Sequence, residues 1–108
     1  MTLDITFDIN NDIATMTLSG ELDRNTSDLF KSKIEAATQT KLSRLVLMME
    51  DLTYMASAGL RVLIFAKQKM GPESEIHIVG AQEIVLDTIK KTGFHHSVTL
   101  LDTLEEDN

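Results

Sequence analysis

A short apolar segment in the middle of the chain most narrows the folds that this sequence can adopt. Residues 45–49 read Leu-Val-Leu-Met-Met, and polar segments bound them on both sides. The run is too short to indicate a helix, but it is typical of a strand that is buried on both faces of a sheet. The segment therefore predicts a central strand. Residues 50–56 are expected to form the loop that follows it.

The beginning of the chain predicts a β-hairpin. Residues 3–9 alternate between apolar and polar side chains, which is the pattern of a strand with one buried and one wet face. Residues 10–12 read Asn-Asn-Asp and favour a turn, because these residue types tolerate left-handed backbone angles. Residues 13–18 alternate again, and a loop over residues 19–25 is expected to lead into a helix.

Three segments have the features of helices. The first is expected to be capped by Asn25 and to end near Gln39. The second is predicted over residues 57–70 with Gly71 as its stop, and the third over residues 82–91. The apolar stripe of the first helix is formed by Leu29, Phe30, Ile34 and Ala37.

Two further strands complete the expected α/β fold. Residues 75–79 alternate and place His77 at a surface or an edge, residues 97–100 suggest a short last strand, and residues 102–108 form an acidic tail whose order stays open. The crossovers are long enough for parallel pairing in part of the sheet. We therefore expect residues 1–108 to form a single domain of the order β-β-α-β-α-β-α-β, with a mixed β-sheet and packed helices.

Composition limits the compartment and the partners. The sequence has no Cys, which fits a reducing compartment, and no export signal is visible, so we expect a cytoplasmic protein. The formal net charge of −7 argues against nucleic acid and anionic membrane as partners, since both would repel the chain. The charge indicates partners that tolerate an acidic surface, or it simply keeps a small protein soluble.

Signatures of common enzymes are absent from the sequence. It has no Gly-rich phosphate loop that ends in Lys-Ser or Lys-Thr, no Gly-x-Ser-x-Gly and no His-Glu-x-x-His. Glu50 and Asp51 are adjacent, so on an extended chain they point apart and form a poor acid–base pair. The neighbouring His95 and His96 are equally poor metal ligands. We expect no catalytic residue, metal or cofactor, and a small enzyme or nucleotide-binding protein remains an alternative that an ATP titration would test.

The junction between the central strand and the second helix is the most informative segment for function. Ser57 is expected to cap this helix, while Ala58 and Gly59 leave the N–H groups of its first turn unshielded. A phosphate on Ser57 would then lie at the positive end of the helix. Thr53 is the nearest substitute for Ser57 as a phosphorylated hydroxyl, and Tyr54 is a less suitable one.

Two separated motifs resemble the signatures of STAS domains, the family of anti-sigma factor antagonists and sulfate-transporter tails. They are Ala-Ser-Ala-Gly-Leu at residues 56–60, where the family has Asp-Ser-Ser-Gly-Leu, and Gly-Glu-Leu-Asp at residues 20–23. The resemblance implies a partner switch in which unphosphorylated Ser57 permits binding to an anti-sigma factor that is also a serine kinase. Phosphorylation of Ser57 ends this binding, and a metal-dependent PP2C-type serine phosphatase restores it.

The resemblance also implies a surface that contacts the kinase. Asp23 by itself is most simply a turn or cap residue, but its loop belongs to the kinase-binding surface in the family. Ala56 replaces the usual acidic residue, which bears on kinase recognition, and Ala58 replaces the second Ser, which leaves Ser57 as the single hydroxyl of the motif. The expected partner-binding residues are Asp23, Thr53, Tyr54, Ala56, Ala58, Gly59, Arg61 and Phe65.

The second helix has one broad apolar face, and Phe65 lies outside it. The apolar face comprises Leu60, Leu63, Ile64, Ala66 and Met70, opposite Arg61, Gln68 and Lys69. Phe65 is either a partly covered helix side chain or an exposed aromatic anchor that acts with Arg61. A second functional hypothesis keeps the fold and makes the chain a STAS subunit of a transporter or lipid-transport complex that acts without phosphorylation.

Overall fold

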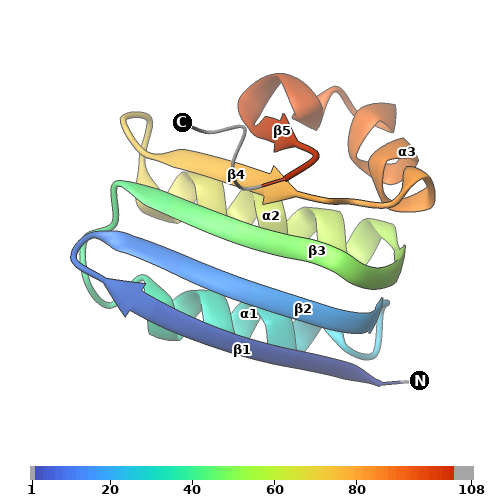
Figure 1. Cartoon of the computed structure of the whole chain (residues 1–108), viewed down its shortest axis with the longest axis horizontal. Coiled ribbons are helices and arrows are strands. Elements are labelled where there is room, and N and C mark those ends of the chain that lie inside the picture. The colour runs from blue at the N-terminus through green and yellow to red at the C-terminus, as the bar shows by residue number, and fades with distance from the viewer. Residues whose placement is uncertain (1, 104–108) are drawn as a thin grey trace.

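The computed structural model describes residues 2–103, which form a five-stranded sheet and the helices that pack on it (Figure 1). The strands lie in the order β1-β2-β3-β4-β5 across the sheet, and α1 and α2 cover one of its faces. The elements are β1 (Leu3–Asn10), β2 (Ile13–Leu22), α1 (Ser27–Ala37), β3 (Arg44–Met55), α2 (Ser57–Met70), β4 (Glu75–Val79), α3 (Glu83–Lys91), the 3-10 helix η1 (Phe94–Ser97) and β5 (Thr99–Leu101).

The sheet is mixed, as the order of elements predicts. β1 and β2 form an antiparallel hairpin, and Asn11 makes its turn with a φ of 60°. β2, β3, β4 and β5 pair in parallel, which requires the helical crossovers between them. The α/β class and the order β-β-α-β-α-β-α-β are confirmed, while η1 was not predicted.

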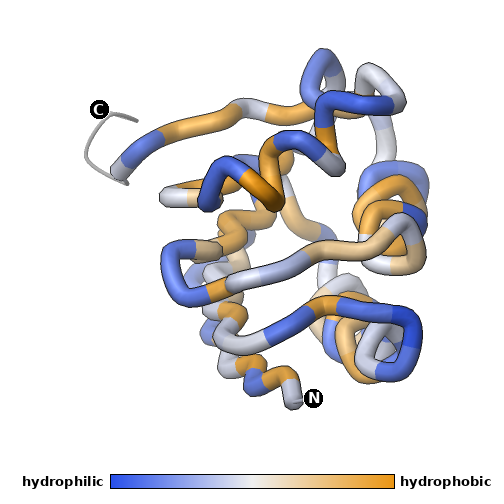
Figure 2. The backbone as a smooth tube through the Cα atoms, turned by 90° about the vertical axis from the view of Figure 1, so that its right-hand side faces the viewer, coloured by the Kyte–Doolittle hydropathy of each residue, from blue (hydrophilic) through white to orange (hydrophobic). Residues whose placement is uncertain are grey.

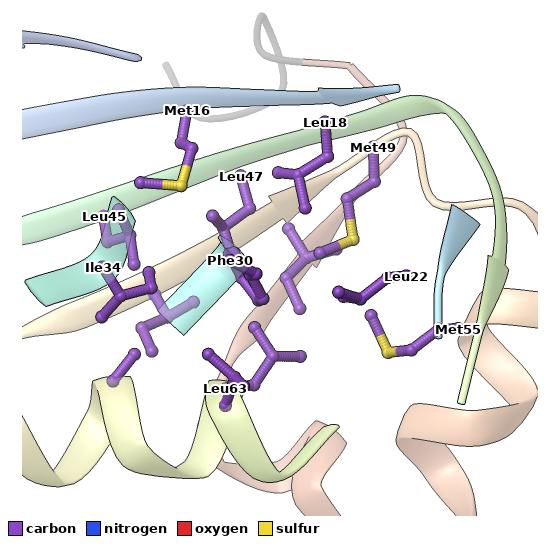
Figure 3. Packing of buried hydrophobic residues seen from close by; sticks show 14 of the residues in the cluster. Met16, Leu18, Leu22, Phe30, Ile34, Leu45, Leu47, Met49, Met55 and Leu63 are labelled. Atoms are coloured by element: carbon purple, nitrogen blue, oxygen red, sulfur yellow. The ribbon is translucent and has the colours of Figure 1, made fainter. Parts of the chain in front are cut away.

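The core fills the space between the sheet and the helices. Turned by 90°, the backbone separates into the sheet and the helices beside it, with hydrophobic stretches in both layers (Figure 2). Phe30 and Ile34 of α1 are fully buried among side chains of β2 and β3 (Figure 3). Each large side chain buried in this way stabilises the fold by about 1.5–3 kcal/mol. The sheet side of this core comprises Met16, Leu18, Leu45, Leu47 and Met49.

Two strands are longer than the sequence predicts, and the expected loops over residues 19–25 and 50–56 are therefore partly wrong. β2 continues to Leu22 and β3 to Met55, and the two strands remain paired up to these last residues. Glu50, Asp51 and Thr53 are exposed, whereas Leu52 is fully buried. The register between β2 and β3 shifts near Gly20. This irregularity interrupts the regular alternation of apolar and polar side chains by which a strand is recognised in a sequence.

Four further predictions need correction: the ends of α1, the place of Leu29, the exposure of His77 and the extent of the last strand. α1 begins at Ser27 and ends at Ala37, short of both predicted ends, and its Leu29 is 41% exposed instead of lying in the apolar stripe. His77 is 3% exposed, because β5 pairs beside β4 and makes β4 an internal strand. Part of the predicted last strand belongs to η1. Of the acidic tail predicted over residues 102–108, positions 104–108 lie outside the described residues.

Candidate functional site

The two motifs that the sequence singles out meet at one end of the sheet. Leu22 and Met55 are paired in the ladder and lie near each other at the ends of their strands (Figure 3). The backbone N–H of Ala56 donates to the carbonyl oxygen of Leu22 at 2.8 Å. The loop that begins with Asp23 therefore starts beside the residue that precedes Ser57.

Asp23 organises the loop between β2 and α1. One carboxylate oxygen, Oδ1, accepts the backbone N–H groups of Asn25 at 2.8 Å and Thr26 at 3.0 Å. In return the Thr26 hydroxyl accepts the Asp23 N–H at 2.9 Å, and it shares its one proton between the carbonyl oxygen of Glu21 at 2.8 Å and Oδ1 of Asp23 at 3.2 Å. This reciprocal pair is a capping arrangement, and it makes Asp23 the cap of the turn that precedes α1.

The Asp23 carboxyl is held in its ionised form although it is 8% exposed. Burial opposes ionisation, but the N–H groups of Thr26 and Asn25 and the Thr26 hydroxyl outweigh it, so the pKa of Asp23 lies below its usual value of 3.8. Its second oxygen, Oδ2, is buried and has no hydrogen-bond partner in the described part of the chain. A negative charge is thus fixed in the loop that follows β2.

Ser57 is the first residue of α2, and the prediction that it caps this helix is wrong. Ala56 is the N-cap, with φ −88° and ψ 168°, because its N–H still belongs to the strand pairing with Leu22. No side chain caps the helix. Ser57 is exposed, and its hydroxyl lies where the helix dipole favours negative charge.

Gly59 joins the two motifs through packing. A Cβ at this position would lie 2.5 Å from Cγ of Leu22 and 2.7 Å from its Cδ2, closer than side-chain carbons approach each other. Only glycine therefore lets α2 lie this close to the end of β2. Its N–H, which was expected to be unshielded, donates to the carbonyl oxygen of Ala56 at 3.0 Å.

Part of the predicted partner surface borders a groove between the start of α2 and α3. The groove has a volume of about 810 Å³. Tyr54 is 38% exposed at its border, while the neighbouring Thr53 lies outside it and donates its hydroxyl to the carbonyl oxygen of Gly20 at 3.0 Å. The groove is lined by Tyr54, Met55, Ala56, Ser57, Leu60, Ile84, Asp87, Thr88, Lys90, Lys91 and Thr92.

Three further predicted residues border a second hollow, which lies between α2 and α1. Ala58, Arg61 and Phe65 border a hollow of about 260 Å³ together with Ser27, Asp28 and Lys31 of α1. Phe65 is half-buried against the core, and Nζ of Lys31 lies 4.9 Å from the centre of its ring. The structure thus shows Phe65 as a partly covered side chain, and its contact with a partner stays a prediction.

Sequence reasoning overlooked Thr26, Ile84, Lys90 and Lys91 as components of this end of the molecule. The spacing of Asp23 and Thr26 was a usable signal, because residues three apart can cap each other. Lys90 and Lys91 stand in the last turn of α3, where cations suit the helix dipole whatever lies beside them. Their place beside Ser57 depends on how α3 packs, which no local pattern shows.

The described residues hold no obvious metal site and no membrane-spanning helix. Among residues 2–103, no group of three or more His, Cys, Asp or Glu side chains is arranged to hold a metal ion. Within the same range, every helix is too short or too polar to cross a membrane.

Comparison with known proteins assigns the fold and the family. The family model of the STAS domain matches residues 4–107. A curated relative, an anti-sigma F factor antagonist from Paenibacillus polymyxa, is 34% identical over 65 residues. This match covers 59% of the chain and 56% of the relative, so it spans little more than half of that protein's length.

Solved structures share the fold at low sequence identity. An anti-sigma factor antagonist from Mycobacterium paratuberculosis superposes with a TM-score of 0.87 at 22% identity, and the match covers 97% of this chain and 90% of that one. The anti-sigma factor antagonist SpoIIAA in its unphosphorylated form gives a TM-score of 0.83 at 18% identity, with 96% and 92% covered. Both likenesses support the architecture described above.

Proposed function

The chain belongs to the STAS domain family, and from this premise we propose that it is an anti-sigma factor antagonist controlled by phosphorylation of Ser57. With Ser57 unmodified, the domain binds an anti-sigma factor that is also a serine kinase. Phosphorylation by this kinase ends the binding, and a PP2C-type serine phosphatase restores it. The chain acts as a binding module in the cytoplasm and catalyses no reaction itself.

The observation that best supports this proposal is the position of Ser57. It is exposed at the start of a helix that no side chain caps, and it borders a groove large enough to admit part of another protein. A kinase can reach its hydroxyl without unfolding the domain. The curated relative bears the name of an anti-sigma F factor antagonist, in agreement with this assignment.

Electrostatics favours release by repulsion at the interface over release by unfolding. A phosphoserine adds about 1.5 to 2 negative charges at neutral pH, and a helix N-terminus stabilises such a charge by about 0.3–1 kcal/mol. The fold therefore tolerates the modification. In an interface that places no donor opposite the phosphate, a penalty of about 4 kcal/mol weakens binding roughly a thousandfold.

Ala56 distinguishes this chain from the usual motif at the kinase contact. Its methyl group lines the groove directly before Ser57, where an acidic side chain stands in the family pattern. The cognate kinase must therefore recognise a neutral surface at this point. We propose that the kinase has diverged together with this antagonist.

A binding assay with three forms of the chain tests the proposal. Wild type and Ser57→Ala should both capture a kinase of this kind, whereas Ser57→Asp should lose it, because the carboxylate imitates part of the phosphate charge. Ser32→Asp, at an exposed Ser of α1, is the matched charge control and should bind like wild type. Mass spectrometry after incubation with kinase and ATP should find phosphate on Ser57 and not on Thr53 or Tyr54.

Equal binding by all three Ser57 forms would contradict the switch. It would favour the alternative function, in which the chain has the same fold and acts as a STAS subunit of a transporter or lipid-transport complex without phosphorylation.

A further inference from the structure

Exposed apolar side chains concentrate at the groove beside Ser57. Among residues 2–103 three large hydrophobic side chains are exposed, and two of them, Tyr54 at 38% and Ile84 at 50%, line this groove. The third, Leu29, lies on α1. Apolar groups that gather at one concave surface of an otherwise charged domain indicate a protein contact.

The groove is formed by elements that are fixed relative to each other. The Thr88 hydroxyl donates to the carbonyl oxygen of Met55 at 3.0 Å and so ties α3 to the end of β3. Met55 and Leu60 are buried beneath it and provide an apolar floor. Ile84, Thr88 and Lys91 recur at the spacing of one helix face, so α3 presents a continuous wall.

The charges at the groove differ from those of the whole molecule. The chain has a net charge of −7, yet two lysines, Lys90 and Lys91, line this groove against one carboxylate, Asp87. The positive end of the α2 dipole lies at the same place. The groove therefore combines apolar walls with a local excess of positive charge.

We propose that this groove receives an acidic, apolar segment of the partner kinase. An apolar side chain of that segment lies between Tyr54 and Ile84, and one or more carboxylates lie next to Lys90 and Lys91. The inference rests on the function proposed above and specifies which part of the partner binds beside Ser57.

This arrangement explains how a phosphate at one residue acts on the interface. The phosphate on Ser57 would place its charge in the groove that the acidic segment occupies, and it would compete with that segment for the lysines. Repulsion and competition both oppose binding. The switch then needs no change in the backbone of this domain.

Charge reversal at the groove tests the inference. With the purified kinase captured by Ser57→Ala, isothermal titration calorimetry should show that Lys90→Glu combined with Lys91→Glu weakens binding about 30-fold or more. Ile84→Ala should weaken it about tenfold, since it removes an exposed apolar contact. Lys41→Glu, at an exposed loop position away from the groove, is the matched control and should stay within about twofold of wild type.

The salt dependence of the same titrations separates charge from shape. Binding of wild type should weaken as salt rises, whereas binding of the double lysine variant should strengthen or stay unchanged, because salt screens the repulsion between the new glutamates and the acidic segment. The circular dichroism melting curve of Ile84→Ala should match wild type, since Ile84 is exposed. The double lysine variant should stay folded and melt slightly lower, because Lys90 and Lys91 lie in the last turn of α3, where the helix dipole favours cations.

The outcomes distinguish this inference from the proposed function. If Ser57→Asp abolishes binding while the groove variants bind like wild type, the partner lies elsewhere and the inference is overturned, although the switch stands. If charge reversal of the lysines tightens binding, the segment is not acidic and the inference is equally overturned. If Ser57→Asp binds like wild type, the proposed function itself fails.

Discussion

At the scale of single residues, the site is defined by an ionised carboxylate and an exposed hydroxyl on neighbouring chain segments. Asp23 stays charged in a buried position because two backbone N–H groups and the Thr26 hydroxyl surround it. Ser57 is exposed in the first turn of α2, and Ala56 occupies the N-cap position. The pKa of Asp23 thus depends on Thr26, which lies outside the motif of residues 20–23.

The depressed pKa of Asp23 predicts a specific dependence of stability on acid. A group whose pKa is lower in the folded than in the unfolded chain binds fewer protons when folded, so it stabilises the fold above the unfolded pKa. This contribution is present above about pH 4 and is lost as the pH falls through the folded pKa. Urea unfolding of wild type between pH 2 and 7 should show this loss, and Asp23→Asn should flatten the profile there while being less stable at pH 7.

A steeper acid profile in Asp23→Asn than in wild type would contradict the assigned hydrogen bonds. Thr26→Val provides an independent check, because it removes the hydroxyl and leaves the two N–H donors in place. Its profile should lie between those of wild type and Asp23→Asn.

At the scale of elements, the close approach of α2 to β2 joins the two motifs into one site. Gly59 leaves room for the side chain of Leu22, and the N–H of Ala56 continues the strand pairing up to the helix. Thr88 holds α3 on the other side of the same strand end. β2, α2 and α3 thus converge near Ser57. The packing of Gly59 on Leu22 and the hydrogen bond of Thr88 hold them there, and each contact can be removed separately.

The packing of Gly59 on Leu22 predicts a double-mutant cycle with strong coupling. Gly59→Ala should destabilise the fold by about 1–3 kcal/mol, because the added methyl group overlaps the Leu22 side chain. Leu22→Ala should cost about 2–5 kcal/mol through the cavity that it leaves. In the double variant the added methyl group occupies the space that the truncated Leu22 side chain leaves. The double variant should therefore lose less stability than the sum of the two single losses.

Chemical denaturation of the four proteins measures this coupling. Additive losses would show that α2 and β2 do not meet at these two residues. Ala58→Gly serves as a control at the preceding helix position and should not couple with Leu22→Ala.

Local sequence patterns predicted most elements but not where two strands end. Alternation indicated β1 and β2, and the apolar run at residues 45–49 indicated the centre of β3. The continuation of β2 to Leu22 and of β3 to Met55 was missed, because polar residues on an exposed side look like a loop when the partner strand is unknown. The burial of His77 was missed for a similar reason, since it depends on the pairing of β5.

The candidate site was predictable where it rests on motifs and not where it rests on packing. The sequence indicated Ser57 and Asp23, and the structure brings their segments together through the pairing of Leu22 with Met55. The sequence did not indicate that Arg61 and Phe65 border a different hollow from the groove that Ser57 borders. Which side of a helix meets which neighbour is a property of the whole fold.

At the scale of the whole molecule, the domain is an acidic body with a cation-containing groove at one end of its sheet. Its net charge of −7 disfavours nucleic acid, and the lysines of α3 lie next to the residue proposed to be phosphorylated. The proposed phosphate would change the charge of this groove, and it would stand outside the core of sheet and helices. Phosphorylation of Ser57 should therefore change the affinity strongly and the structure of the domain hardly at all.

Both parts of that prediction can be measured on the phosphorylated and unphosphorylated chain with the same kinase. Titration should show affinity lower by about a thousandfold after phosphorylation of Ser57. Backbone amide spectra of the two forms should agree except near the junction of β3 and α2 and the start of the Asp23 loop. Equal affinity of the two forms, or a loss of signal dispersion throughout the spectrum, would contradict the account.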